Sequence, residues 1–363
     1  MPEPWAVGLF AVGLCNLLLG IGVVFKTHDL FDFGDFYASA CGWWQGTDPY
    51  VRPNLNPPHA SVLLAPLCVL APYPAWFVWQ VVNLVAWLAA LRLAWHTRRT
   101  PLTFGAVAVL VAHGSTSAQV HMGQVAWLLG LPMTLSWLAF RRGAHRRAGL
   151  WLGIVLAAKP FVMLAALPAL FDQRWRATWL LASTTAGAIF GLGYVSLGGE
   201  AYTRWAAWSA PAMALAAHPM NVSLTSLALL LGLSPLVGIA LGIAATMAWL
   251  PRWRVLTTDR QWLAMLTMLV LSAPLGWLHY TAWTLPMLWA AWPTLAPRRR
   301  LWALVLICVP MLLLVLALET AALRFVYPIG FLVFAWTALG PATGDVTRDM
   351  LDSSSPSNPI INS

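Results

Sequence analysis

Long apolar runs separated by short polar turns extend from the N-terminus to about residue 340. Runs of this length match the thickness of a bilayer core, so the pattern predicts an all-α polytopic membrane protein. About ten of the runs are long enough to predict full membrane spans. They cover residues 5–25, 74–95, 102–119, 125–140, 177–197, 226–250, 261–278, 281–296, 301–318 and 325–340.

Two further apolar stretches do not fit as full crossings. Residues 60–70 are too short and lie between two groups of prolines. Residues 149–171 are long enough, but arginine clusters flank both ends and Lys159-Pro160 interrupts the middle. Irregular backbone is tolerated at membrane depth where it lines a cavity. We therefore expect two re-entrant or half-helix elements.

Composition supports a membrane protein and excludes an ordinary soluble domain. The chain is 60% hydrophobic and 9% charged, whereas soluble domains carry about a quarter charged residues. Its net charge of +9 comes largely from arginine clusters between the spans, which is the positive-inside pattern of membrane proteins rather than a nucleic-acid site. With these clusters inside, both termini are cytoplasmic. Residues 1–340 form one membrane domain, and the polar residues 341–363 are expected to be a disordered cytoplasmic tail.

This orientation places the polar chemistry on the outer, extracytoplasmic face. The first outer loop, residues 26–60, is acidic, and a second long outer loop covers residues 198–226. The chain has 23 tryptophans, most of which are expected to be interfacial anchors. Cys41 and Cys68 could share the outer face, but their spacing predicts neither a disulfide nor a metal motif.

The acidic residues of the first outer loop are the first candidates for catalysis. Residues 26–50 hold four of the twelve acids in the chain. Asp32 and Asp35 are three positions apart and would share one helix face, where a carboxylate could act as general base. The alternative for any one acid is a helix cap or an ion pair with a basic residue such as Arg52.

Polar residues elsewhere supply candidates for ligand binding. Lys159 lies within an apolar segment, and an intramembrane lysine usually faces the bundle interior, although it could also extend to an interface. His279 and Tyr280 follow a predicted span at its outer end. Three amides on the outer side either line a sugar site or satisfy backbone groups at helix ends. They are Asn56, Gln124 and Asn221.

The order of the motifs resembles a known enzyme family. The segment DFGDFYASACGWWQGTDPY followed by NPPHASVLLAPL resembles the first outer loop of the polyprenol-phosphate-sugar-dependent glycosyltransferases of family 87. The segments GQVAWLL, GLWLGIVLAAKPFVML, NVSLTSL and SAPLGWLHYTAWTLP follow in the family's order. The resemblance covers about residues 30–286.

The resemblance implies a GT-C fold and an inverting transferase whose site faces the extracytoplasmic side of a bacterial inner membrane. Asp32 matches the family's catalytic base, and Asp35 is the second candidate. Lys159, His279 and either Arg52 or Arg204 would neutralise the phosphate of a polyprenyl-phosphate donor. The sugar is expected to be mannose, the acceptor a hydroxyl of a lipid or glycan, and no metal or other cofactor is implied.

Two other classes of protein remain open at this point. A transporter or flippase would explain broken helices and a buried lysine, but the sequence contains no second copy of the acidic loop or of the AAKP break that an internal repeat would require. A membrane acyltransferase or a non-catalytic subunit is also compatible with the composition.

Overall fold

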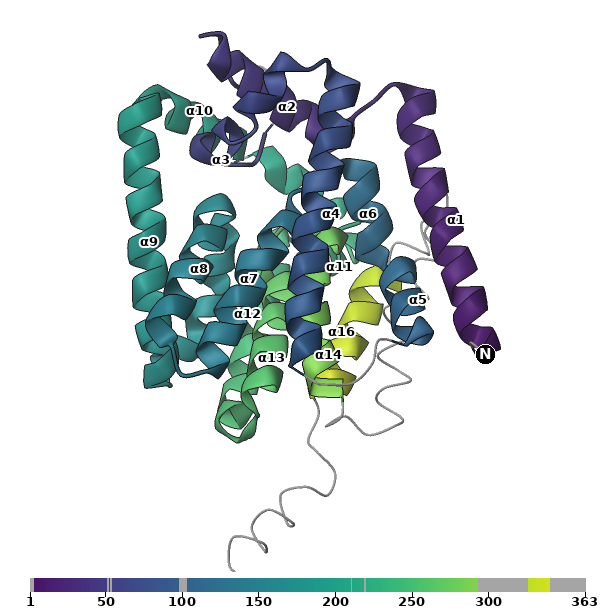
Figure 1. Cartoon of the computed structure of the whole chain (residues 1–363). Helices are drawn as coiled ribbons and strands as arrows, with labels where there is room; N and C mark the ends of the chain where they lie inside the picture. The colour runs from purple at the N-terminus through teal and green to yellow at the C-terminus, as the bar shows by residue number, and fades with distance from the viewer. Residues whose placement is uncertain are drawn as a thin grey trace, which may run out of the picture.

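The computed structural model describes residues 3–50, 52, 54–97, 103–209, 211–218, 220–292 and 326–339. Over these ranges the protein is a bundle of helices, and the only β pairing is an isolated bridge between Asn221 and Trp277. Several short helices cover one end of the bundle, which is the upper end in Figure 1, and the N-terminus lies at the opposite end. The predicted span 301–318 and the predicted tail 341–363 lie outside the described residues.

Three helices are long and apolar enough to cross a membrane. They are α1 (Pro4–Thr27), α4 (Pro72–His96) and α9 (Gln173–Leu197). Each coincides with one of the predicted spans, because a long uninterrupted apolar run has no better local structure than a helix. The all-helical class predicted from the sequence is therefore confirmed.

The remaining helices of the bundle are shorter. They are α5 (Phe104–Ala112), α6 (Gly114–Met122), α7 (Ala126–Arg141), α8 (His145–Ala158), η2 (Pro160–Leu170), α11 (Leu224–Leu230), α12 (Pro235–Trp249), η4 (Leu250–Val255), α13 (Thr258–Ser272), η5 (Leu278–Trp283), α14 (Thr284–Ala291) and α16 (Val326–Leu339). The elements at the upper end are α2 (Phe31–Trp44), α3 (Pro58–Val62), η1 (Ala65–Val69), α10 (Gly199–Ser209) and η3 (Pro211–Ala217).

Two predicted spans are wrong as single helices. The stretch 102–119 is split between α5 and α6 at His113, whose extended backbone and ring nitrogen cap the second helix by accepting from the Ser115 N–H at 3.1 Å. The stretch 226–250 is split between α11 and α12, where Gly232 has a φ of +73° and Ser234 caps the next helix. Hydropathy averages over such turns and therefore hides them.

Residues 145–171 form a helical hairpin that returns to its starting end. At 1.5 Å per residue α8 is about 21 Å long, and at 2.0 Å per residue the 3₁₀ helix η2 is about 22 Å long. The His145 carbonyl accepts from Thr178 in the first turns of α9, and the Asp172 carboxylate caps the start of that helix. The break predicted at Lys159-Pro160 is present, because proline has no N–H to continue the helix.

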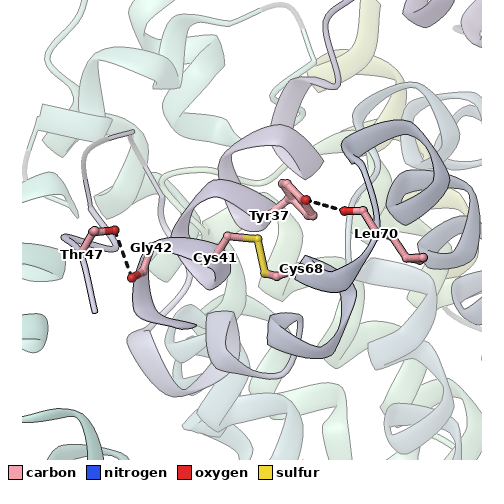
Figure 2. The surroundings of a disulfide bond; sticks show 6 residues. All are labelled: Tyr37, Cys41, Gly42, Thr47, Cys68 and Leu70. Carbon is pink, nitrogen blue, oxygen red and sulfur yellow. Dashed lines mark hydrogen bonds between the residues drawn. A yellow bond between two sulfur atoms is a disulfide. The ribbon is translucent and has the colours of Figure 1, made fainter. Parts of the chain in front are cut away.

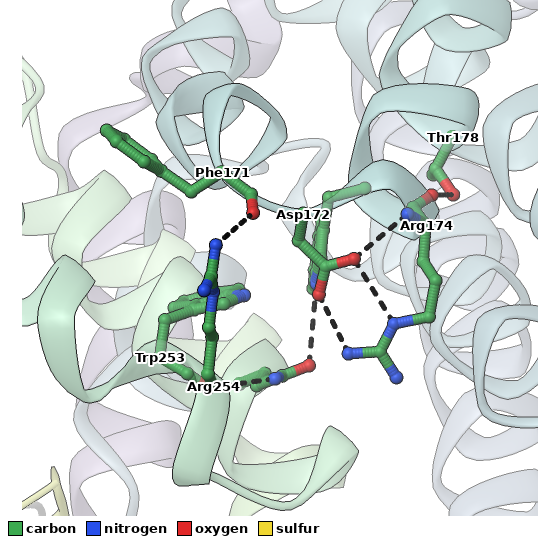
Figure 3. Close-up of polar contacts among 8 residues, drawn as sticks. Phe171, Asp172, Arg174, Thr178, Trp253 and Arg254 are labelled. Carbon is green, nitrogen blue, oxygen red and sulfur yellow. Dashed lines mark hydrogen bonds and ion pairs between the residues drawn. The ribbon is translucent and has the colours of Figure 1, made fainter.

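Basic residues gather at this lower end of the bundle. Asp172 accepts from the Arg174 guanidinium at 2.7 Å, and Arg254 donates to the Phe171 carbonyl at 3.3 Å (Figure 3). Nearby, Arg141 pairs with Asp259 at 3.5 Å. Arg141, Arg174 and Arg254, which belong to three of the arginine clusters, therefore lie at one end of the bundle, opposite α2.

The hairpin packs tightly on α9 through glycines. A Cβ atom at Gly149 would lie 2.5 Å from the Thr178 carbonyl oxygen, and one at Gly153 would lie 2.5 Å from the Thr185 Cβ. Such distances are below van der Waals contact, so only glycine allows the two backbones to approach this closely.

We predict that Gly149→Val lowers stability by roughly 1–3 kcal/mol, because the added side chain forces α8 away from α9. Gly187→Val on α9 is the matched control, since a Cβ there meets no atom within 4 Å. The thermal midpoint of the detergent-solubilised protein measures the effect. Equal midpoints for the two variants would contradict the close packing.

Candidate active site

Helix α2 carries the two candidate acids and covers the upper end of the bundle. Its inner face buries Phe33 and Phe36 in the core. The Asp29 carboxylate accepts from the Phe31 N–H at 2.8 Å and so holds the start of the helix. Asp32 and Asp35 are both half-buried and both line a cavity beneath α2. The predicted sharing of one helix face is therefore present.

A disulfide between Cys41 and Cys68 ties the far end of α2 to η1 (Figure 2). Beside it, the Tyr37 hydroxyl donates to the Leu70 carbonyl at 2.7 Å. The sequence left these cysteines unpaired, because the loop that brings them together has no characteristic spacing. The cross-link limits the motion of the helix that carries both acids.

A turn between α6 and α7 brings Gln124 to Asp32. Gly123 has a φ of +64°, and a Cβ there would lie 2.5 Å from the Phe33 Cβ, so glycine is required both by the turn and by the approach of α2. The Trp79 indole donates to the Gly123 carbonyl at 2.7 Å and holds the turn. In this position the Gln124 side-chain amide donates to the Asp32 carboxylate.

The cavity has a volume of about 640 Å³, a size typical of ligand sites. Its walls come from α2, the α6–α7 turn, the α8–η2 break, α10, η3, η5 and the segment before η5. Six of the residues predicted from the sequence line it. They are Asp32, Asp35, Gln124, Lys159, His279 and Tyr280.

The two carboxyl groups have altered acidities. Burial raises the pKa of Asp32, while the hydrogen bond from Gln124 and the charge of Lys159 partly oppose that change. Burial and the neighbouring Asp32 charge raise the pKa of Asp35 to about 6, with Arg52 opposing the rise. Perturbed carboxyl groups in a cleft are typical of functional sites.

Lys159 supplies a positive charge at the break between α8 and η2. The side chain is 6% exposed, and its Nζ atom lies 6.0 Å from the Phe36 ring centre and 5.6 Å from the Tyr280 ring centre. Among the described residues, no acidic oxygen lies within the 4.0 Å that defines an ion pair with it. The ammonium therefore faces the cavity as a cation that an anionic ligand could neutralise.

His59 holds this break open from the first outer loop. Its Nε2 atom donates to the Ala157 carbonyl at 3.0 Å, and its Nδ1 atom accepts from the Tyr202 hydroxyl at 2.9 Å. The end of α8 at Ala158 leaves the Ala157 carbonyl without its helical partner, and the imidazole replaces it. His59 had not been singled out from the sequence.

His279 brings a second unused polar group to the cavity. The side chain is 2% exposed, and its Nε2 atom is buried without a hydrogen-bond partner. Its ring lies against Tyr280 at 4.3 Å and stacks on Trp277 at 6.4 Å. A buried polar atom without a partner is costly in a folded protein, which is consistent with a ligand that completes the site.

The other predicted residues lie outside the cavity lining. Asn221 donates to the Ala216 and Pro274 carbonyls, both at 2.9 Å, and so joins the two segments that carry cavity residues. Asn56 hydrogen-bonds to Asn54 in the first outer loop. Arg52 is exposed and acts on Asp35 through its charge.

Several cavity residues were missed from the sequence. Trp205, Trp208, Trp277 and His218 all line the cavity. In a chain with 23 tryptophans no local signal separates these from interfacial anchors. Within the described residues, no group of three or more His, Cys, Asp or Glu side chains could hold a metal ion.

The described residues thus form a helical bundle whose cavity is lined by two acids, a lysine and a histidine. Residues 54–279 match the sequence model of glycosyltransferase family 87, and the chain belongs to this family. No curated protein and no solved structure matches the chain. The matched region includes Gln124, Lys159 and His279 and begins after α2.

We predict that replacing Cys41 and Cys68 together with serine lowers the free energy of unfolding by about 2–4 kcal/mol, because the loop between them gains freedom in the unfolded state. Chemical denaturation of the purified protein measures the change. Cys15→Ser is the control, since Cys15 is a free thiol on α1. An unfolding free energy that stays at the wild-type value in the double variant would show that the cross-link does not support α2.

Proposed function

We propose that the protein is an inverting glycosyltransferase that moves a sugar, with mannose favoured, from a polyprenyl-phosphate donor to a hydroxyl of a lipid or glycan acceptor. The observation that carries this proposal is one cavity that combines a carboxylate pair, a buried cation and an unpartnered histidine. Family membership supports the transfer of a sugar.

The proposed reaction proceeds in one displacement. The Asp32 carboxylate takes the proton of the acceptor hydroxyl as that oxygen attacks the anomeric carbon. The bond from that carbon to the phosphate oxygen breaks, and the electron pair leaves with the phosphate. The Lys159 ammonium and the His279 Nε2–H stabilise the departing charge within the apolar cavity, where such interactions are strong.

Asp32 is preferred to Asp35 as the base because of its surroundings. The Gln124 amide binds the Asp32 carboxylate and orients it. Lys159 acts on Asp32 through its charge, so the base and the phosphate-binding group lie near each other. Asp35 then holds the acceptor or adjusts the acidity of Asp32 through its own charge.

The proposed orientation places the cavity on the extracytoplasmic side of a bacterial inner membrane. The Cys41–Cys68 disulfide beside the site supports this, because disulfides persist in oxidising compartments. The arginine-rich opposite end supports it as well, because basic residues are enriched on the cytoplasmic side of membrane proteins.

We predict that Asp32→Asn abolishes transfer from a synthetic polyprenyl-phosphate sugar, with a loss of at least roughly a hundredfold in kcat, while the protein stays folded. Radiolabelled sugar transferred by purified protein in liposomes is the measurement. Asp29→Asn is the matched control, because its side-chain oxygen can still accept from the Phe31 N–H. Full activity of Asp32→Asn would remove Asp32 as the base, and movement of a solute without sugar transfer would favour a transporter.

We also predict a pH dependence. The base must be ionised, so kcat/KM should fall as the pH drops through an Asp32 pKa that burial has raised. Lys159→Met removes a charge that lowers this pKa and should move the acidic limb of the profile to higher pH. Lys26→Met is the control and should leave the limb in place. A limb that shifts downward in Lys159→Met would contradict the proposed pairing.

A further inference from the structure

One wall of the cavity is formed by the aromatic face of α10. Trp205 and Trp208 lie three residues apart on the inner side of this helix and line the cavity. Tyr202, one turn earlier on the same side, binds His59. The opposite side of the helix carries Thr203 and Arg204, which are exposed. The helix is therefore amphipathic, with its tryptophans turned inward.

The polar atoms of both indoles are already used. The Trp205 Nε1–H donates to the Leu55 carbonyl at 3.1 Å, and the Trp208 Nε1–H donates to the Tyr50 carbonyl at 2.9 Å. These bonds attach the rings to the first outer loop and limit their rotation. These two side chains therefore present only ring carbon atoms to the cavity, because both indole N–H groups already donate to the first outer loop.

The ring of Trp208 is open to a ligand. Within the described part of the chain it has no aromatic partner, whereas Trp205 packs against Phe190 with 6.2 Å between ring centres. The face of an aromatic ring carries a partial negative charge and attracts groups with a positive edge. The C–H hydrogens on one face of a sugar ring carry such a partial positive charge. A sugar that stacks through these hydrogens keeps its hydroxyls free for other contacts.

The surroundings of α10 favour an aqueous ligand over a lipid tail. Arg204 pairs with Asp48 of the first outer loop and with Glu200 at 2.5 Å, and the Glu200 side chain is 76% exposed. Charged side chains on the outer side of a helix are costly against hydrocarbon. The tryptophan wall therefore lies between the cavity and water, on the side from which a hydrophilic molecule would enter.

We propose that Trp205 and Trp208 form a stacking platform for a carbohydrate acceptor, which makes the acceptor a glycan rather than a simple lipid hydroxyl. This inference rests on the proposed function and specifies its substrate class. The platform holds the terminal sugar ring of the acceptor so that one of its hydroxyls reaches Asp32.

The test measures binding in the absence of donor, with the full chain in nanodiscs. Short mannose, glucose, galactose and arabinofuranose oligosaccharides are each offered free and attached to a lipid, and dissociation constants are determined by calorimetry. We expect one glycan to bind wild-type protein. Trp205→Ala and Trp208→Ala should each weaken that binding roughly tenfold and raise the acceptor KM equally, with the donor KM unchanged. Binding of the lipid-attached form alone would identify the acceptor as a glycolipid.

A phenylalanine variant separates stacking from attachment to the first outer loop. Trp208→Phe keeps an aromatic face but cannot donate to the Tyr50 carbonyl, so it should retain most of the binding that Trp208→Ala loses. Trp44→Ala is the control, because Trp44 is 60% exposed at the end of α2 and lies outside the cavity lining. Thermal midpoints establish that each variant is folded.

Several results would overturn the inference. They are no binding of any glycan in either form, equal losses in Trp208→Phe and Trp208→Ala, an increase in the donor KM alone, or unchanged acceptor binding in both alanine variants. Sugar transfer by wild-type protein with an unaltered acceptor KM in the alanine variants would reject the platform and keep the proposed function. Glycan binding that depends on the platform, without any sugar transfer, would reject the proposed function and keep the glycan site.

Discussion

The buried charge of Lys159 is the constraint on which the rest of the site depends. An ammonium group within an apolar bundle is costly unless a partner or a cavity stabilises it. Pro160 ends α8 directly after the lysine, so the chain turns back and leaves space around the side chain. The acidic face of α2 lies above this space, and His59 satisfies the carbonyl that the break exposes. The cation, its opposing carboxylate and the cavity thus follow from one interruption of a helix.

The remaining walls are held by short polar contacts between segments that are distant in the chain. The turn at Gly123 brings Gln124 beneath α2. Position 123 must be glycine, because a Cβ atom there would collide with Phe33. Asn221 joins the segment before α11 to the segment before η5. Helix η5 itself carries His279. The disulfide attaches α2, within the first outer loop, to η1. The tryptophans of α10 donate hydrogen bonds to backbone carbonyls of the same loop. The catalytic proposal therefore relies on rigid contacts around a cavity rather than on any one motif.

The sequence predicted those features that depend on local composition. It indicated three long helices correctly, together with the break at Lys159 and the common face of Asp32 and Asp35. The prediction of single spans failed within residues 102–119 and 226–250, because hydropathy averaged over a window of residues conceals a turn. The sequence left open whether Asn56 lines a sugar site or satisfies backbone groups, and in the structure its side-chain amide donates to Asn54 within the first outer loop. An isolated polar residue in an apolar stretch has the same local appearance in either role.

By itself, the sequence determined that the protein is helical and that it is suited to a membrane. It also determined that four of the twelve acids gather within residues 26–50, while the arginines cluster elsewhere. Only the tertiary structure decided that Asp32, Lys159 and His279 share one cavity, that Cys41 and Cys68 are bonded, and that two tryptophans of α10 face inward. The physical reason is the range of the forces involved. Hydrophobicity and helix breaking act between near neighbours in the chain, whereas this cavity is formed by contacts between residues that are distant in the chain, such as Asp32 with Gln124 and Tyr50 with Trp208.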